Sequence, residues 1–205
     1  RYHPVLGYTY VPNQFLRSTF ADNPFFVQTN SIGFRSDFDY REEKSKNKRI
    51  VFLGDSHTAG DGAINNESRF SDILSKTFSD VEFLNFGVGG FGVDQQILAY
   101  EEIVVKFKPD IIFLCFHQKD DLIRNVSREA MIGNDGKIIH LSKPYFDFDH
   151  GSLRLQNVPV QNNLVYKNIG FSDVENKSLK YNVRLLLKYL AENSNLPLFI
   201  KSQIE

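Results

Sequence analysis

The chain has 205 residues, a length typical of a single domain and long enough to bury most of its surface without a disulfide or a structural metal. Its 24 basic and 25 acidic residues nearly balance, which argues against a nucleic acid or an anionic membrane surface as a partner. One cysteine, Cys115, excludes an internal disulfide, and no apolar run approaches the ~20 residues that a membrane-spanning helix requires.

Residues 1–48 are expected to form an irregular, partly extended lead-in that packs on the rest of the chain. Short extended pieces are predicted at Gly7–Val11 and Phe25–Thr29, and prolines interrupt the pattern around them. The charged stretch Arg41–Arg49 is expected to be a solvated connector. The sequence starts at Arg1 rather than Met, which leaves open an export leader or an anchor before residue 1, and with it the compartment.

Residues 49–205 are expected to form one domain in which strands alternate with helices. Continuous apolar runs are typical of strands buried on both faces, and apolar residues every three or four positions are typical of helices. Strands are predicted at Arg49–Gly54, Val81–Phe86, Asp110–Phe116 and Leu196–Lys201, and helices at Glu67–Phe78, Asp94–Lys108 and Ser178–Glu192. Repeated strand–helix units indicate an α/β fold with a parallel sheet and helices on both faces.

The alternation is broken at about residues 126–176. This stretch contains the turn Gly133–Gly136 and the strand-like Lys137–Leu141, and it predicts an inserted hairpin and loop within the domain. Ligands of parallel α/β sheets bind beyond the carboxyl ends of the strands. We therefore expect the chemistry to lie in the loops that follow the predicted strands.

The first predicted strand ends in the sequence GDSH, with Ser56 at the turn from strand to helix. A serine at this place has its hydroxyl at the edge of the sheet and a backbone N–H that can stabilise a developing oxyanion. The alternative is a plain helix N-cap, because Asp and Ser commonly cap helices that follow strands. Ser56 is thus a candidate nucleophile, with Asp55 or Ser56 as a candidate cap.

The second predicted strand ends in the glycine-rich sequence NFGVGGFG. Glycines permit left-handed backbone and a close approach to a ligand, although a merely tight turn would also use them. The pattern G-x-G-x-x-G at Gly87, Gly89 and Gly92 also fits a dinucleotide-binding turn. That pattern needs an acidic residue at the end of the next strand, whereas Asp110 opens this strand and Asp120 comes late. Nucleotide binding therefore stays the less favoured alternative.

The first three predicted strands end, in this order, at the sequences GDS, N-x-G-x-x-G and Q-x-D-D. Together these three sequences resemble the conserved blocks of the GDSL or SGNH hydrolase family. Any one of these segments alone is unspecific, but their order and spacing are not. The three matching segments are Arg49–Gly60, Asn85–Gly90 and Gln118–Asp121, and the second matches the family pattern at Asn85, Gly87 and Gly90. The upstream segment Thr29–Arg35 also looks like the lead-in found in many bacterial members. The resemblance covers residues 28–125 well and residues 178–203 loosely.

This resemblance implies a three-layer α/β/α sandwich with a mainly parallel, flavodoxin-like sheet. It implies a carboxyl-ester hydrolase or an acyl transferase, in which a serine attacks an ester carbonyl with the help of a histidine that an aspartate orients. By position the nucleophile is Ser56, and the oxyanion donors are its own N–H, the N–H of Gly90 and the side chain at Asp120. The expected substrates are esters of small molecules or carbohydrates, with no metal or organic cofactor.

Asp120 departs from the family pattern, which has asparagine at this position. An ionised carboxylate cannot donate a hydrogen bond to an oxyanion, and loss of one donor costs about 100- to 1000-fold in rate. Three alternatives stay open: Asp120 is protonated, Gln118 or Lys119 takes its place, or the activity is weak or absent.

The acid–base pair is the second departure. The family places an Asp-x-x-His block beyond the strand that corresponds to Leu196–Lys201, and we therefore expect this block after Glu205. Asp147 and His150 spell the same motif at another place in the topology, and His117 follows the third predicted strand. His57 adjoins the nucleophile, but neighbouring side chains diverge. A catalytically inactive SGNH-like domain that binds a glycan or a protein is the alternative function.

Overall fold

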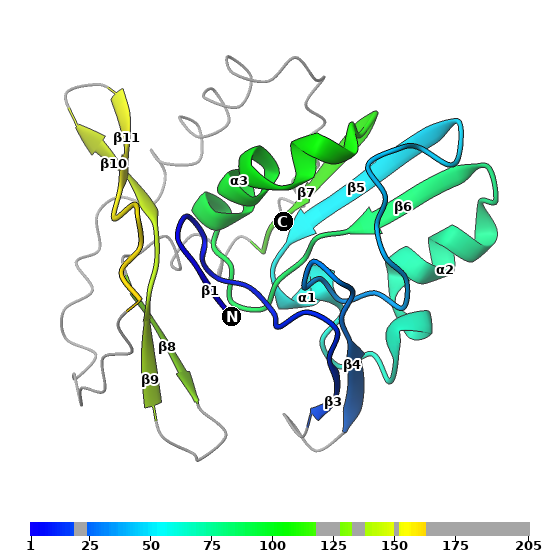
Figure 1. Cartoon of the computed structure of the whole chain (residues 1–205), viewed down its shortest axis with the longest axis horizontal. Coiled ribbons are helices and arrows are strands. Elements are labelled where there is room, and N and C mark those ends of the chain that lie inside the picture. Colours follow the sequence, from blue (N-terminus) through cyan, green and yellow to red (C-terminus); the bar gives the residue numbers. More distant parts are fainter. Residues whose placement is uncertain (19–23, 118–127, 133–137, 150–151, 163–205) are drawn as a thin grey trace.

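The computed structural model describes residues 1–18, 24–117, 128–132, 138–149 and 152–162 of the chain. Its centre is a parallel sheet of three strands in the order β6-β5-β7 (Figure 1). The strands are β5 (Lys48–Gly54), β6 (Val81–Asn85) and β7 (Ile111–Cys115). The predicted α/β class and parallel sheet are confirmed, and these three strands match their predicted ranges closely. The helix and strand predicted after residue 177 lie outside the described residues.

The two faces of β5 pack against different helices, because successive side chains of a strand point to opposite faces. Val51 and Leu53 lie in the main hydrophobic core together with Ile97 and Leu98 of helix α3 (Val93–Glu102). Burial of each such side chain contributes about 1.5–3 kcal/mol. The alternation therefore fixes which face of the sheet receives α3.

An aromatic cluster covers the opposite face. The ring of Phe52 stacks on those of Phe83, at 6.1 Å between centroids, and Phe113, at 5.5 Å. Phe70, the first residue of helix α2 (Phe70–Thr77), meets Phe52 edge to face at 4.9 Å. Three adjacent strands thus each contribute one phenylalanine, and α2 packs on the strand pair β5–β6.

The two predicted helices that lie in the described part of the chain, Glu67–Phe78 and Asp94–Lys108, are shorter than predicted. The first begins as a 3₁₀ turn, η1 (Asn66–Ser68), and becomes α2 only after Arg69, which is extended at φ −76° and ψ 150°. The second stops at Glu102 and continues as the 3₁₀ turn η2 (Val104–Phe107). Three consecutive β-branched residues, 103–105, follow Glu102 and lower the helix propensity there. None of the helices in the described part is long and apolar enough to cross a bilayer.

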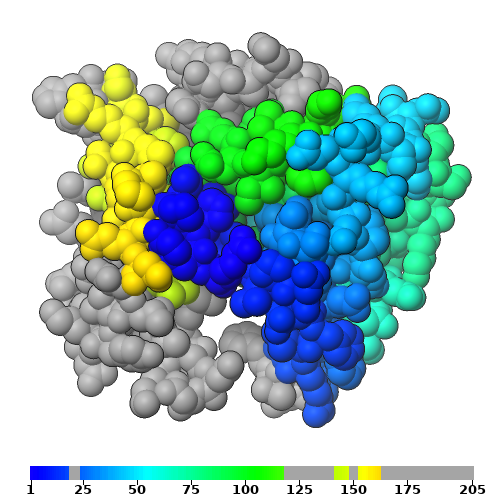
Figure 2. All heavy atoms as spheres, viewed as in Figure 1, coloured from blue at the N-terminus to red at the C-terminus, as the bar shows by residue number. Residues whose placement is uncertain are grey.

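The N-terminal segment forms two hairpins and contributes to the main core. The hairpins pair β1 (Tyr2–His3) with β2 (Gly7–Tyr8) and β3 (Phe15–Ser18) with β4 (Phe25–Gln28). Leu6 and Phe34 are completely buried in the same core as α3. Figure 2 shows the first residues of the chain, in dark blue, bordered by the yellow hairpin segment on one side and by green and lighter blue residues on the others.

Two hairpins occupy the region where the sequence predicts one hairpin and a loop. They pair β8 (Arg128–Ile132) with β9 (Ile138–Ser142) and β10 (Tyr145–Asp149) with β11 (Ser152–Gln156), and Figure 1 shows them together on one side of the molecule. Phe146 is buried in the main core, and the N–H of Val160 donates to the carbonyl of Pro4 at 2.7 Å. This side of the molecule is therefore joined to the N-terminal segment and to α3.

Residues 41–48 are mostly exposed, as expected for a solvated connector, but Arg49 at its end is completely buried, which corrects the expectation for that residue. Its guanidinium donates to Glu82 Oε2 at 2.7 Å, to the carbonyls of Arg41, Glu42 and Glu43 at 2.8–2.9 Å, and to the carbonyl of Phe107. Partial burial alone would raise the pKa of Glu82, but the hydrogen bonds from Arg49 and Ser45 outweigh it and hold the pKa below its ordinary value. One arginine thus joins the connector, β6 and η2.

Replacement of Arg49 should therefore destabilise the fold. Arg49→Met removes the cation from Glu82 and leaves several carbonyls without donors, and we expect a loss of about 3–5 kcal/mol in the free energy of unfolding. Lys48→Met, at the exposed neighbouring position, should stay within about 0.5 kcal/mol of wild type. Urea titration of both variants checks this, and equal midpoints would contradict the role assigned to Arg49.

A second buried charge, Asp94, holds the hairpin β10–β11 against the start of α3. Asp94 Oδ2 accepts the N–H of Phe146 at 2.9 Å. Burial raises the pKa of Asp94 to about 7, although this hydrogen bond and the nearby Lys143 oppose the shift. A raised pKa means that the folded protein binds a proton which the unfolded chain releases. The contribution of this proton to the free energy of unfolding is complete below the ordinary pKa of an aspartate and is lost as the pH rises through about 7.

Asp94→Asn should remove this pH dependence, since the amide oxygen still accepts the N–H of Phe146 but cannot titrate. Between about pH 4 and about pH 8, wild type should lose on the order of 1–3 kcal/mol of unfolding free energy relative to the variant. Urea titrations of both proteins across this range measure the difference. A difference that does not change with pH would contradict a raised pKa at Asp94.

Candidate active site

Ser56 is the first residue of the short helix α1 (Ser56–Ala59), directly after β5. Asp55 is the N-cap, and its carboxylate accepts the N–H of His57 at 2.9 Å. The capping role considered for Ser56 therefore falls to Asp55. Ser56 is half-buried, and no described residue forms a hydrogen bond with its hydroxyl.

The glycine-rich turn after β6 lies directly against α1. A β-carbon on Gly87 would come within 2.4 Å of the backbone nitrogen of Ala59, so only glycine fits at this contact. Asn85 fastens the same contact, because its amide donates to the carbonyl of Thr58 at 2.6 Å and its Oδ1 accepts the N–H of Gly87 at 2.9 Å. Asn85 and Gly87 thus set the distance between the serine helix and the turn.

Ser56 meets this turn at Gly89. A β-carbon on Gly89 would lie 3.8 Å from the Cβ of Ser56 and 3.5 Å from Oδ2 of Asp61. Gly90 follows with a left-handed backbone, at φ +80°. Neither the N–H of Ser56 nor that of Gly90 has an acceptor among the described residues. Two of the predicted site residues, Ser56 and Gly90, therefore come from strand ends that meet.

Asp61 borders Ser56, and Tyr10 lies beside Gly89, where its hydroxyl accepts the N–H of Gly89; sequence reasoning missed both residues. The chain reverses at Gly60, φ +82°, and the N–H of Asp61 donates to the carbonyl of Ser56 at 2.9 Å. Desolvation and the charge of Asp55 raise the pKa of Asp61, whereas Arg35 and His57 oppose the shift. The sequence signal that could have identified Asp61 as a neighbour of Ser56 was its position, five residues after the serine and directly after a glycine turn.

Arg35, the last residue of the lead-in segment Thr29–Arg35, is a buried side chain that binds the C-terminal end of α1. It is almost completely buried and donates to the carbonyls of Gly60 at 2.5 Å, Ala63 at 3.0 Å and Phe26 at 2.8 Å. Because the carbonyls at a helix C-terminus lack partners within the helix, a buried guanidinium stabilises them. The lead-in segment therefore helps to set the path of the serine loop.

The histidines whose side chains the structure describes interact with groups other than the Ser56 hydroxyl. Nδ1 of His57 lies 3.2 Å from Asp55 Oδ2, and its ring stacks on that of His117 at 5.3 Å. His3 Nδ1 accepts the N–H groups of Val5 and Leu6. Among the described residues, no histidine forms a hydrogen bond with Ser56.

The other predicted site residues are not brought to Ser56 by the described part of the chain. Asp147 lies in β10, whose hairpin is at the outer edge of the molecule, away from α1 (Figure 1). Asp120, with its possible substitutes Gln118 and Lys119, and His150 lie outside the described residues.

Cys115 ends β7 and is half-buried, and burial raises the pKa of its thiol to about 11. The thiol therefore stays protonated near neutral pH and is a poor nucleophile or metal ligand. Within the described ranges there is no group of three or more His, Cys, Asp or Glu residues that could hold a metal ion.

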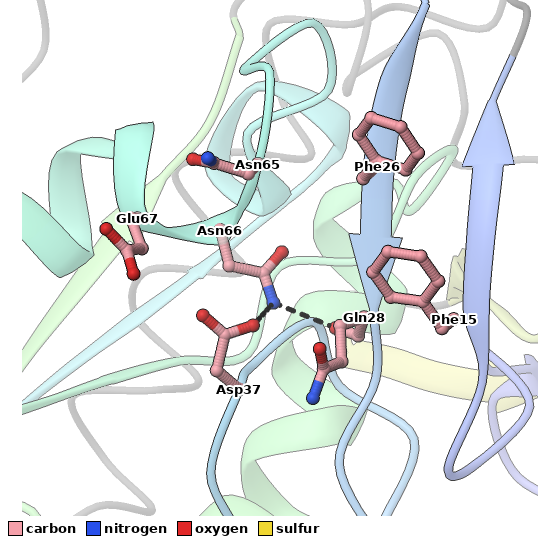
Figure 3. Close-up of a pocket in the computed structure, with 7 residues that line it drawn as sticks. All are labelled: Phe15, Phe26, Gln28, Asp37, Asn65, Asn66 and Glu67. Carbon is pink, nitrogen blue, oxygen red and sulfur yellow. Dashed lines mark hydrogen bonds between the residues drawn. The ribbon is translucent and has the colours of Figure 1, made fainter.

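A shallow pocket of about 170 Å³ lies between the hairpin β3–β4 and η1, apart from Ser56 (Figure 3). Asn66 spans its floor by donating to Asp37 Oδ1 at 2.6 Å and to the carbonyl of Gln28 at 3.1 Å. The same side chain accepts a hydrogen bond from Arg35 at 2.7 Å. These bonds satisfy Asn66 within the protein, and its arrangement is that of a structural link.

No protein-family model matches the chain, and a search of the curated proteins finds no match. The resemblance to SGNH hydrolases therefore stays an expectation from the sequence blocks.

The contact between Gly87 and α1 can be tested with matched glycine variants. Gly87→Ala should cost about 2–3 kcal/mol, because the added methyl group overpacks the backbone of α1. Gly62→Ala should cost only about 1 kcal/mol from left-handed strain, since Gly62 has φ +91° and no atom within 4 Å of the added carbon. Thermal or urea unfolding measures both. A Gly87 variant no less stable than the Gly62 variant would show that turn and helix do not touch.

Proposed function

We propose that the protein is a serine-dependent carboxyl-ester hydrolase or O-acyl transferase of the SGNH type, with Ser56 as nucleophile. The observation that supports this most is that the Cβ of Ser56 lies 3.8 Å from the point where a β-carbon on Gly89 would stand. The Ser56 hydroxyl and the N–H groups of Ser56 and Gly90 have no hydrogen-bond partner among the described residues, and both residues lie in segments that follow parallel strands at the same edge of the sheet. Acyl transfer needs this combination of a nucleophile and oxyanion donors.

In the proposed reaction, Ser56 Oγ forms a bond to the ester carbonyl carbon, and its proton passes to a histidine base. The negative charge that develops on the carbonyl oxygen is stabilised by the N–H groups of Ser56 and Gly90. Collapse of this intermediate breaks the bond to the alkoxide, which takes the proton from the histidine and leaves as an alcohol. Water, or a second alcohol in a transferase, then attacks the acyl-enzyme by the reverse sequence.

The remaining parts of the proposal follow the SGNH pattern. The complete domain is a three-layer α/β/α sandwich, the third oxyanion donor comes from the segment around Asp120, and the acid–base pair comes from an Asp-x-x-His block. The substrates are esters of small molecules or carbohydrates, and the reaction uses no metal or organic cofactor.

A catalytically inactive SGNH-like domain that binds a glycan or a protein is the second candidate. It is favoured by the absence of a histidine bonded to Ser56 in the described part of the chain, and by the acidic residue at position 120. It does not explain why the Ser56 hydroxyl stays unengaged beside a closely fitted turn.

Covalent labelling separates the two candidates. We expect a fluorophosphonate ester to label the full-length protein once, at Ser56, and the label to vanish in Ser56→Ala. Ser79→Ala, which removes an exposed serine outside the site, should label like wild type. Mass spectrometry of tryptic peptides locates the label.

A wild-type protein that stays unlabelled, yet has an unchanged unfolding midpoint, would support the binding domain. A rise in melting temperature with NAD or ATP in the same unlabelled protein would favour nucleotide binding at the glycine-rich turn.

A further inference from the structure

Two tyrosines of the N-terminal segment hold Gly89 from both sides of its backbone. The N–H of Gly89 donates to the hydroxyl of Tyr10 at 2.8 Å, and the hydroxyl of Tyr8 donates to the carbonyl of Gly89 at 3.1 Å. These bonds join residues about 80 positions apart in the sequence, and each one fixes a different peptide plane of the turn.

The bond from Tyr8 determines where the N–H of Gly90 points. The carbonyl of Gly89 and the N–H of Gly90 belong to one planar trans peptide, so they point in opposite directions. A donor that holds the carbonyl on one side therefore directs the N–H to the other. Gly90 itself tolerates φ values of either sign, and without this hold the peptide could rotate at small cost.

The bond to Tyr10 removes the neighbouring donor from the site. Because the N–H of Gly89 is already engaged, Gly90 supplies the only unengaged N–H of this glycine pair in the described structure. Burial and the charge of Asp61 raise the pKa of Tyr10 above its ordinary value, so Tyr10 stays a neutral hydroxyl. A β-carbon on Gly89 would lie 3.2 Å from the Tyr10 oxygen and 3.8 Å from Ser56 Cβ, so tyrosine and serine flank the same glycine.

Both tyrosines are themselves held in place. The ring of Tyr8 packs edge to face on that of Phe91 at 5.4 Å, and Gln95 Nε2 donates to the carbonyl of Leu6 at 2.7 Å. Tyr10 is covered by the lead-in loop at Gly33, where a β-carbon would come within 2.6 Å of the Tyr10 carbonyl oxygen. The N-terminal segment is therefore rigidly supported at the point where it touches the turn.

We propose that Tyr8 and Tyr10 are positioning residues for the oxyanion donor of Gly90, and that residues 1–48 thereby belong to the catalytic unit. This inference rests on the proposed function. Neither tyrosine touches the substrate; each acts through the backbone of Gly89.

The test compares Tyr8→Phe and Tyr10→Phe with Tyr2→Phe in the full-length protein. Tyr2 is the matched control, since it lies on the same segment and its hydroxyl also donates to a carbonyl, that of Val160, at 2.6 Å. We expect each of the first two variants to react with the fluorophosphonate, and to turn over a phenyl acetate, roughly 10-fold more slowly, a fraction of the 100- to 1000-fold cost of losing a donor outright. The effect should fall on kcat and leave KM and the melting temperature close to those of Tyr2→Phe.

Each outcome has a defined meaning. Equal kcat values in all three variants would overturn the positioning role while leaving the proposed function intact. If kcat and the melting temperature fell together in all three variants, the tyrosines would stabilise the fold without a specific role in positioning Gly90, and the inference would be wrong. An unlabelled wild-type protein would instead contradict the proposed function, and the catalytic role of the tyrosines with it. If a Phe variant fails to fold, the ¹⁵N–¹H shifts of Gly89 and Gly90 in Tyr8→His or Tyr10→His supply the comparison, and unchanged shifts would overturn the inference.

Discussion

The contact between two stretches of backbone, the glycine-rich turn after β6 and the helix α1, is the constraint on which the rest of the site depends. No side chain separates Gly87 from Ala59, and Asn85 bonds to both elements. Because backbone-to-backbone contact leaves no adjustable side chain at the boundary, the distance between them is set within a narrow range. Ser56 and Gly90 inherit their relative position from this contact. An enzyme that must aim fixed dipoles at a developing charge gains from such rigidity.

Buried cations hold the surroundings of this contact by binding main-chain carbonyls. Arg49 joins the connector to β6 and η2, Arg35 holds the end of the serine loop, and Lys143 Nζ donates to the carbonyl of Gly90 at 3.1 Å. Buried charge is costly unless it is well satisfied, so each of these side chains orders several segments at once. The N-terminal segment and the hairpins are in this way tied to the same few residues around the site. The pocket beside η1 is connected to this network through Arg35, which donates to the carbonyl of Phe26 and to Asn66 in the pocket lining.

The sheet was predictable because its strands are largely apolar runs, and that of β5 ends in glycine. The order of the strand ends also predicted that Ser56 and the glycine-rich turn lie at one edge. The buried state of Arg49 was not predictable, since all its partners except Glu82 are carbonyls, which every residue carries and no sequence pattern distinguishes. The same holds for Tyr8 and Tyr10, because a tyrosine that bonds to backbone about 80 residues away has no periodic signal. The predictions for Asp120 and His150 concern residues outside the described part and stay predictions.

The central claim is that Ser56 Oγ, the N–H of Ser56 and the N–H of Gly90 face one reacting atom. A crystal structure of the protein after reaction with a phosphonate ester tests this most directly, because the phosphoryl oxygen of the adduct stands where the oxyanion would. The account predicts phosphorus bonded to Ser56 Oγ, with that oxygen about 2.7–3.1 Å from both backbone nitrogens. An adduct whose oxygen points away from Gly90, or phosphorus bonded to a different residue, would contradict it.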